Sequence, residues 1–286
     1  MEIGIAPINF GGPETAERMI ETVQYAESAG IESVWTFEHV IVPTEYESVY
    51  PYGRSGKMPI APEAWLIDLL ISLAHIAAAT KTIRIGTGVN IFPQANPLLF
   101  AKQTASLDVL SGGRLELGLG IGWLAEEYDA MGTPFARHGA RFDDYLEAVK
   151  KVWSGEVVEH RSELLSWHDF KSYPTPIQKP HPPILIGGTT NKSLRRVVDS
   201  AQGWYAPSDS QEQLEEGITE LRRLAAEAGR PFDTIEVSAS WRVNKRPDAL
   251  PEFEDLGIER AVAFLSWAGQ SDPRQAIDVI ASHAGL

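Results

Sequence analysis

The sequence predicts a (β/α)8 barrel (a TIM barrel) built from one domain over residues 1–286, with insertions after strand 2 and between strands 4 and 5. Short β-branched runs alternate with longer segments of helical periodicity, and about eight such strand–helix units fill the chain. No linker or break in composition separates two domains. Repeated units of this kind form a parallel sheet with helices outside, and barrels of this class commonly have about 250 residues.

The first third of the chain shows the alternation most clearly. Ala16, Met19 and Val23 fall on one helical face, and Gly30 stands where a glycine ends a helix. Residues 40–62 are irregular and rich in proline and glycine, and loops of this length are often functional lids or are disordered. The elements expected here are strands 2–6, 33–37 and 82–92, and helices 66–79 and 97–110, the last opened by Pro97.

The remaining elements follow from the same patterns. Residues 156–183 form a second irregular region, in which 174–183 are too rich in proline for a helix or a central strand. The strands expected are 114–119, 184–186, 203–206, 234–243 and 260–265, and the helices are 124–131, 140–153, 192–201, 211–229 and 273–284.

An open doubly wound sheet would also alternate strand and helix. Its dinucleotide-binding form carries Gly-x-Gly-x-x-Gly directly after the first strand. Here the first strand is followed by Pro7-Ile-Asn-Phe-Gly-Gly-Pro13, so the closed barrel is favoured.

Composition narrows the function. The chain has 39 acidic and 25 basic side chains, a net charge of −14, which argues against nucleic acid and anionic membranes as partners. It has no cysteine, so disulfides, thiolate nucleophiles and cysteine-bound metals are excluded. No apolar run approaches the roughly 20 residues of a membrane span. The expectation is a cytoplasmic enzyme with a small-molecule substrate.

Active sites of parallel barrels lie at the carboxyl ends of the strands. Glu38 and His39 follow the second strand, where a histidine can act as a general acid or base or can hydrogen-bond locally as a loop residue. Gly86 and Gly88 lie within the third strand, where glycine marks either a close approach to a ligand or a tight barrel interior. The histidines, aspartates and glutamates show no convincing metal-ligand spacing, so we expect no metal.

Two further glycine segments could face a ligand. Gly118, Gly120 and Gly122 lack the dinucleotide spacing but could form a smooth floor for a flat ring. Gly187-Gly-Thr-Thr-Asn191 joins a strand to a helix, where backbone N–H groups can bind phosphate or where Thr and Asn simply cap the helix. Trp35 and Trp204 are expected in the core. Three tyrosines of the first long loop, Tyr46, Tyr50 and Tyr52, could stack on a substrate or pack together.

Taken in order, these segments resemble the bacterial luciferase-like superfamily, in its F-420-dependent oxidoreductase branch. The resemblance covers essentially the whole chain and is strongest over 31–127 and 174–208. It is carried by Trp35-Thr-Phe-Glu-His-Val40, Tyr50-Pro-Tyr52, Ile85-Gly-Thr-Gly-Val89, residues 97–114, Gly118-Leu-Gly-Ile-Gly-Trp123 with Glu126-Glu127, residues 182–188 and Gly203-Trp204.

The resemblance implies the roles of several residues. A deazaflavin would lie across the barrel mouth, against a non-proline cis peptide at Gly88–Val89, with Asn90 beside it. Gly120 and Gly122 would line the ring or its side chain. The cofactor phosphate would be held by Gly187, Gly188 and Thr189, and His39 with Glu38 would handle a proton near the redox-active carbon.

The chain departs from the family at two positions. Sugar-phosphate-oxidising relatives carry a carboxylate where this chain has Trp123, which argues against that substrate class. Many relatives have Asp where this chain has Glu38, so the reach of that carboxyl differs.

The implied activity is hydride transfer between coenzyme F-420 and a small organic substrate, in a homodimer. An FMN-dependent luciferase-like monooxygenase is the alternative on the same fold. A non-catalytic flavin-binding protein is another. A barrel hydrolase using Glu38 and Glu116 would need about 5–9.5 Å between its two carboxylates.

Overall fold

The computed structural model describes residues 1–53, 55–207 and 210–286. Within these residues eight parallel strands close into a barrel in the order β1-β12-β11-β10-β9-β6-β5-β3, which confirms the predicted TIM barrel. The first and last strands of the chain pair and complete the ring. The barrel strands are β1 (Glu2–Ala6), β3 (Ser33–Thr36), β5 (Arg84–Ile91), β6 (Leu115–Gly120), β9 (Ile184–Gly187), β10 (Gly203–Ala206), β11 (Glu236–Trp241) and β12 (Arg260–Phe264).

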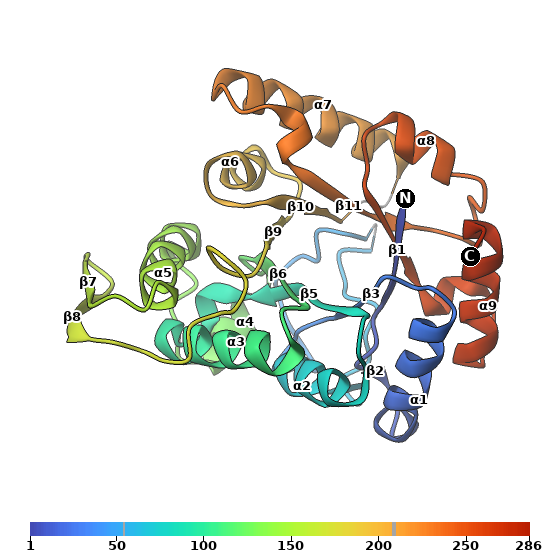
Figure 1. Ribbon diagram of the computed structural model, residues 1–286, viewed down its shortest axis with the longest axis horizontal. Helices are drawn as coiled ribbons and strands as arrows, with labels where there is room; N and C mark the ends of the chain where they lie inside the picture. Colours follow the sequence, from blue (N-terminus) through green and yellow to red (C-terminus); the bar gives the residue numbers. More distant parts are fainter. Residues whose placement is uncertain (54, 208–209) are drawn as a thin grey trace.

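Helices surround the strands (Figure 1). Side chains fix several of their starts: Asp68 accepts the Ile71 N–H at the start of α2, and Asn96 and Asp272 do the same for α3 and α9. No helix of the described residues is long and apolar enough to cross a membrane. The α-helices are α1 (Glu14–Ser28), α2 (Leu69–Ala79), α3 (Pro97–Ser111), α4 (Ala125–Ala130), α5 (His138–Trp153), α6 (Asn191–Ser200), α7 (Gln211–Glu227), α8 (Leu250–Asp255) and α9 (Pro273–Ala284), and the 3₁₀ turns are η1 (Phe92–Gln94), η2 (Phe232–Thr234) and η3 (Leu265–Ala268).

Three regions differ from the sequence-based expectation. The helix expected from residue 66 begins instead at Leu69, because β4 (Trp65–Leu66) pairs with β2 (Phe10–Gly11) ahead of the Asp68 cap. The region 156–183, expected to be irregular, contains an antiparallel hairpin of β7 (Val158–Arg161) and β8 (Ser166–Phe170). This hairpin projects beside α5 (Figure 1). The short helix α8 was not expected at all.

The amino-terminal end of the barrel is closed by charged side chains. Arg260 is 2% exposed, and its guanidinium lies 2.9 Å from carboxylate oxygens of both Glu32 and Glu116. The same guanidinium also binds Glu2 and Glu236, and Glu116 is bound in addition by Arg84. A buried guanidinium is tolerated because carboxylates compensate its charge, so this end of the barrel is a structural plug.

The carboxyl-terminal end of the barrel is filled differently. Ala6, Trp35, Leu185, Tyr205 and Val262 form an apolar cluster inside the ring. The side chains that cover this cluster, all partly buried, are Phe37, Val89 and Phe264. Trp35 and Trp204 are buried as predicted.

Candidate functional site

The floor of the barrel mouth is apolar. Phe37 and Phe264 meet edge to face with ring centroids 5.3 Å apart, and Phe264 stacks on Trp267 at 3.9 Å. Val89 completes this layer from β5. Since Phe37, Val89 and Phe264 each lie near the carboxyl end of a strand, they form an apolar surface where barrel enzymes bind their ligands.

Val89 lies at an irregular part of β5. The pairing of β5 with β6 shifts register between Thr87 and Asn90, and the Gly88–Val89 peptide bond is cis, as expected from the resemblance. A Cβ on Gly120 would lie 2.6 Å from Cγ2 of Val89, and one on Gly187 would lie 2.9 Å from its Cγ1. These two glycines therefore make room for Val89, a reason that the sequence alone did not suggest; their contact with a cofactor stays a prediction.

Glu38 is held at this same irregularity. Its Oε2 accepts hydrogen bonds from the Asn90 amide, at 2.8 Å, and from the Ile91 backbone N–H. Burial raises the pKa of Glu38 to about 8; the Ile91 hydrogen bond lowers it and the nearby charge of Glu127 raises it further. Glu38 is thus a neutral carboxylic acid at pH 7 and can donate a proton or a hydrogen bond.

His39 is fixed by a buried carboxylate from α4. Its Nδ1 lies 2.8 Å from Oε2 of Glu127, whose side chain is fully buried. The other oxygen of Glu127 accepts the Val40 backbone N–H at 2.5 Å. A histidine held by a carboxylate at one nitrogen has its other nitrogen available for acid–base chemistry.

The first long loop packs against Trp123. The ring centroids of Tyr46, Tyr50 and His39 lie 5.8, 5.2 and 6.1 Å from that of Trp123, all nearly edge to face. Tyr52 joins the group through Tyr50. The three tyrosines and Trp123 therefore form an aromatic wall beside His39. Trp123 is the residue that takes the place of the carboxylate in sugar-phosphate-oxidising relatives.

The first turn of α4 ties down this loop. Glu126 accepts the backbone N–H groups of Glu47 and Ser48, and the Ala125 N–H donates to the Ser48 hydroxyl. Burial raises the pKa of Glu126, but several hydrogen bonds to its charged form together outweigh this effect and lower the pKa to about 2. Three consecutive residues of α4, Ala125 to Glu127, thus bind the segment that carries His39 and Tyr46.

The turn after β9 has the geometry of a helix start. Gly188 has φ +104°, which a residue with a side chain rarely adopts, and its carbonyl accepts the Trp204 indole N–H at 2.8 Å. Thr190 caps α6 by accepting the Ser193 N–H, and Thr189 is exposed. Both alternatives from the sequence remain compatible with this turn: it is a capped helix, and the amino end of its helix dipole can attract phosphate.

Buried polar atoms without a hydrogen-bond partner among the described residues include Oδ1 of Asn90, in the irregular part of β5, and the hydroxyl of Tyr205, which would lie 2.7 Å from a Cβ placed on Gly88. A buried polar atom without a protein partner can be satisfied by a bound ligand or by water. A planar heterocycle with ring N–H and carbonyl groups over Val89 fits these atoms and the apolar floor.

One alternative from the sequence is wrong. Glu116 does not approach Glu38: it lies near the start of β6 in the amino-terminal plug, bound to Arg84 and Arg260, whereas Glu38 lies beyond the end of β3. Strand direction places the two carboxyls at opposite ends of the barrel, so they cannot flank one scissile bond.

Gly122, another predicted site residue, lies at the same end of the barrel as Glu38. Gly122 has φ +70°, and a Cβ there would lie 2.6 Å from Ile91 next to the Glu38 site.

The sequence did not identify Glu127, Phe264 or Trp267 as site residues. For Glu127 a signal existed, because it belongs to the Glu126-Glu127 pair quoted for the resemblance; its contact with His39 spans 88 residues and is not visible in any local pattern.

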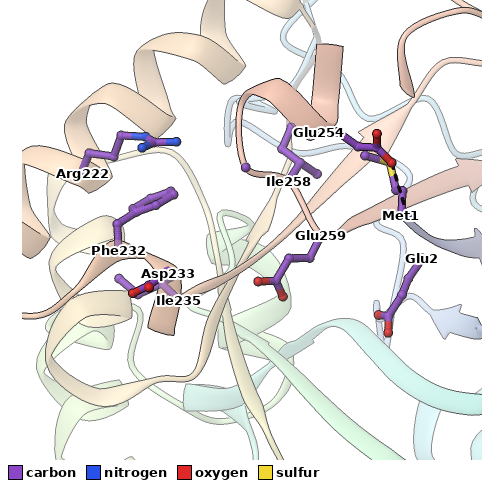
Figure 2. A pocket seen from close by; sticks show the side chains of 10 residues that line it. Met1, Glu2, Arg222, Phe232, Asp233, Ile235, Glu254, Ile258 and Glu259 are labelled. Carbon is purple, nitrogen blue, oxygen red and sulfur yellow. Dashed lines mark ion pairs between the residues drawn. The ribbon is translucent and has the colours of Figure 1, made fainter. Parts of the chain in front are cut away.

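One cavity lies away from the candidate site. A hollow of about 760 Å³ lies at the amino-terminal end of the barrel, where Glu2, Arg222 and Glu259 line it (Figure 2). It is framed by the starts of β1, β11 and β12 and by the plug. In barrel enzymes the residues at this end contribute to stability, and the catalytic residues lie at the other end. The hollow is therefore separate from the candidate site.

Two relatives of known sequence are each 31% identical to this chain. An uncharacterised protein of Mycobacterium tuberculosis (strain H37Rv) is 31% identical over 235 residues, 82% of each chain. The oxygenase component of a flavin-dependent trigonelline monooxygenase from Acinetobacter baylyi is 31% identical over 186 residues, 64% of this chain and 46% of that protein.

Solved structures agree on the fold. The coenzyme F-420-dependent tetrahydromethanopterin reductase of Methanopyrus kandleri superimposes with a TM-score of 0.74 over 99% of this chain and 98% of its own, at 18% identity. The family model described as luciferase-like monooxygenase matches residues 2–249. With the closed barrel and a mouth built from the predicted segments, this match shows that the chain belongs to the luciferase-like monooxygenase family.

Proposed function

We propose that this protein is an oxidoreductase that uses coenzyme F-420 and transfers a hydride between the deazaflavin and a small organic substrate. The observation that carries the proposal is the meeting of three features at one mouth: an apolar floor, the neutral acid Glu38 and the carboxylate-bound His39. The apolar floor can bind a flat ring. The two ionisable groups can donate or accept the proton that must accompany a hydride.

The proposed roles follow the geometry. Val89 and Asn90 would lie against the ring, with Gly88, Gly120 and Gly122 giving the space, and the phosphate would lie at Gly187, Gly188 and Thr189. When bound, the deazaflavin supplies the carbon that accepts or donates the hydride. Glu38 holds a proton beside Asn90, His39 exchanges one at the substrate, and the Trp123 wall excludes water.

The substrate would be small, with an apolar or aromatic body and a polar group at the reacting carbon. Trp123 and the tyrosines Tyr46 and Tyr50 present ring surfaces beside His39, and Trp123 takes the position at which sugar-phosphate-oxidising relatives carry a carboxylate. We also propose that the protein acts as a homodimer, without nucleic acid or membrane partners.

FMN-dependent monooxygenation is the second candidate. It is favoured by one observation, the 31% identity to a flavin-dependent monooxygenase component. Both rings are planar and phosphorylated, so the same floor and turn would accept either.

Binding separates the two candidates. The purified protein is titrated with F-420 and, separately, with FMN, following fluorescence. Tight binding of F-420 with weak binding of FMN would support the F-420 proposal. Tight binding of FMN alone would favour the FMN-dependent monooxygenase over the F-420-dependent enzyme. Binding of neither cofactor would overturn both candidate functions.

A further inference from the structure

We propose that Glu127 is a positioning residue that fixes His39 as the tautomer with the proton on Nδ1, so that Nε2 is a hydrogen-bond acceptor. The atoms involved all belong to this chain. The proposed function enters only in the last consequence, that the substrate gives His39 a hydrogen bond from a hydroxyl or N–H group.

The two oxygens of Glu127 have different partners. Oε1 lies 2.5 Å from the Val40 backbone nitrogen, and Oε2 lies 2.8 Å from Nδ1 of His39. A backbone N–H can only donate, so Oε1 must accept. A carboxylate accepts at its second oxygen too, and therefore Nδ1 of His39 carries the proton.

Glu127 and His39 are shielded from solvent and have few other polar partners. The Glu127 side chain is fully buried and that of His39 is 11% exposed. Within the described residues, the partners of the Glu127 carboxylate are the Val40 N–H and His39, and Nε2 of His39 has no hydrogen-bond partner. Among the described residues no other group hydrogen-bonds to either ring nitrogen of His39. The bond to Glu127 therefore determines which nitrogen carries the proton.

The charged and titratable groups around His39 come from several elements. Glu38 precedes it in the chain and Glu127 faces it from α4; Tyr46 packs on Trp123 from the long loop, and Asp68 at the start of α2 faces Glu38. Among these, Glu127 alone bonds to the imidazole.

The same geometry predicts an unusual property of one variant. In Glu127→Gln the Val40 N–H still requires an acceptor, so the amide oxygen must take the place of Oε1. The amide NH₂ then takes the place of Oε2 and donates to Nδ1. That reverses the tautomer: Nε2 gains the proton and becomes a donor. Because glutamine has nearly the same shape as glutamate, the packing should be preserved.

The test is the nitrogen NMR spectrum of the histidine rings, recorded as a pH series on the cofactor-free protein. The His39 signals are assigned by their loss in His39→Asn. We expect Nδ1–H in the wild type, Nε2–H in Glu127→Gln, and no change in Asp129→Asn, an exposed carboxylate on the same helix. Thermal melts check that each variant is folded.

Turnover is the second measurement. A histidine held as the wrong tautomer loses about 10²- to 10⁴-fold in kcat. We expect a loss of that size in Glu127→Gln with cofactor affinity unchanged, and wild-type turnover in Asp129→Asn.

The outcomes separate the inference from the proposed function. Wild-type protein with Nδ1 unprotonated, or Glu127→Gln with the wild-type tautomer, would overturn the inference whatever cofactor binds. Reversal of the tautomer in a protein that binds neither F-420 nor FMN would support the inference and remove the proposed function. If Glu127→Gln fails to fold, the wild-type spectrum alone still decides the matter.

Discussion

Asn90 donates its side-chain amide to the carboxyl of Glu38 across 2.8 Å, and this bond joins the end of β3 to the irregular part of β5. Since burial raises the pKa of Glu38 to about 8, the folded state binds this proton more tightly than the unfolded state, whose pKa is near 4.5. The stabilising contribution is therefore full below about pH 4.5 and is lost as the pH rises through about 8. Glu38→Gln should remove this part of the pH dependence.

Urea unfolding at pH 6 and pH 9 measures the effect. The wild type should lose stability between these values by up to about 1.4 kcal/mol for each pH unit through this group, and Glu38→Gln should lose less. An equal loss in the variant would show that Glu38 ionises normally.

Gly120 should not tolerate a methyl group while Val89 is present. A Cβ at this position would lie 2.6 Å from Cγ2 of Val89, and overpacking of this kind destabilises by about 1–3 kcal/mol. Gly120→Ala should therefore lower the free energy of unfolding, and adding Val89→Ala should restore part of it. A double-mutant cycle by urea unfolding measures the coupling. If Gly120→Ala destabilises both backgrounds equally, the methyl group meets something other than Val89.

His39→Ala should reduce turnover by about 10²- to 10⁴-fold, because the group that exchanges the proton is removed. The affinity for the cofactor should change little, since the floor and the turn after β9 are intact. His168→Ala, which alters an exposed histidine on β8, is the matched control. Turnover and fluorescence titration are compared in all three proteins. Wild-type turnover in His39→Ala would remove His39 from the mechanism.

Arg260→Met should destabilise the barrel by about 3–5 kcal/mol at pH 8, because buried carboxylates lose their cation. Burial already raises the pKa of Glu236 to about 7 and raises that of Glu32, although Arg260 lowers both. Without Arg260 these carboxyls bind protons more readily, so lowering the pH to 5 should recover part of the loss.

Chemical unfolding at the two pH values measures the recovery. Arg137→Met, which breaks an exposed pair with Glu163, should change stability by less than about 0.5 kcal/mol at either pH. A loss in Arg260→Met that does not depend on pH would contradict the electrostatic explanation.

The proposed homodimer would use α2. This helix contains no Asp, Glu, Lys or Arg, and Ile71 is 67% exposed on a face that also carries Ala74 and Ala78. His75 is the one ionisable residue on this exposed face, and an exposed helix face that is otherwise apolar is usually covered by a partner. Ile71→Glu should shift sedimentation from dimer to monomer, whereas Val157→Glu, at another exposed apolar residue, should not. A wild-type monomer would remove the proposal.

The regular parts of the fold could be predicted because their signals are local. The bounds expected for β1 and α9 agree with the structure, since each is a clear apolar pattern with a defined start. The β7–β8 hairpin was missed because its strands are short and lie in a segment that ends in prolines. The helix α8 was missed because its six residues carry too little periodicity.

The site was predictable only in outline. The carboxyl ends of the strands indicated Glu38 and His39, because parallel barrels share that geometry. The partner of His39, Glu127, and the floor residue Phe264 depend on contacts between segments far apart in the chain. Such contacts leave no periodic pattern, so they appear only once the barrel is closed.

The three hydrogen-bonded positions at the start of α4 have a consequence for engineering and for evolutionary divergence. Ala125, Glu126 and Glu127 bind two points of the loop that follows β3, one at Val40 and one at Glu47 and Ser48. A loop transplanted from a relative would therefore arrive without its anchors, unless α4 were exchanged in the same step. Substrate range in this fold should change through paired replacement of two segments about 80 residues apart, and single-loop chimeras should lose ordered access to His39 before they gain a new preference.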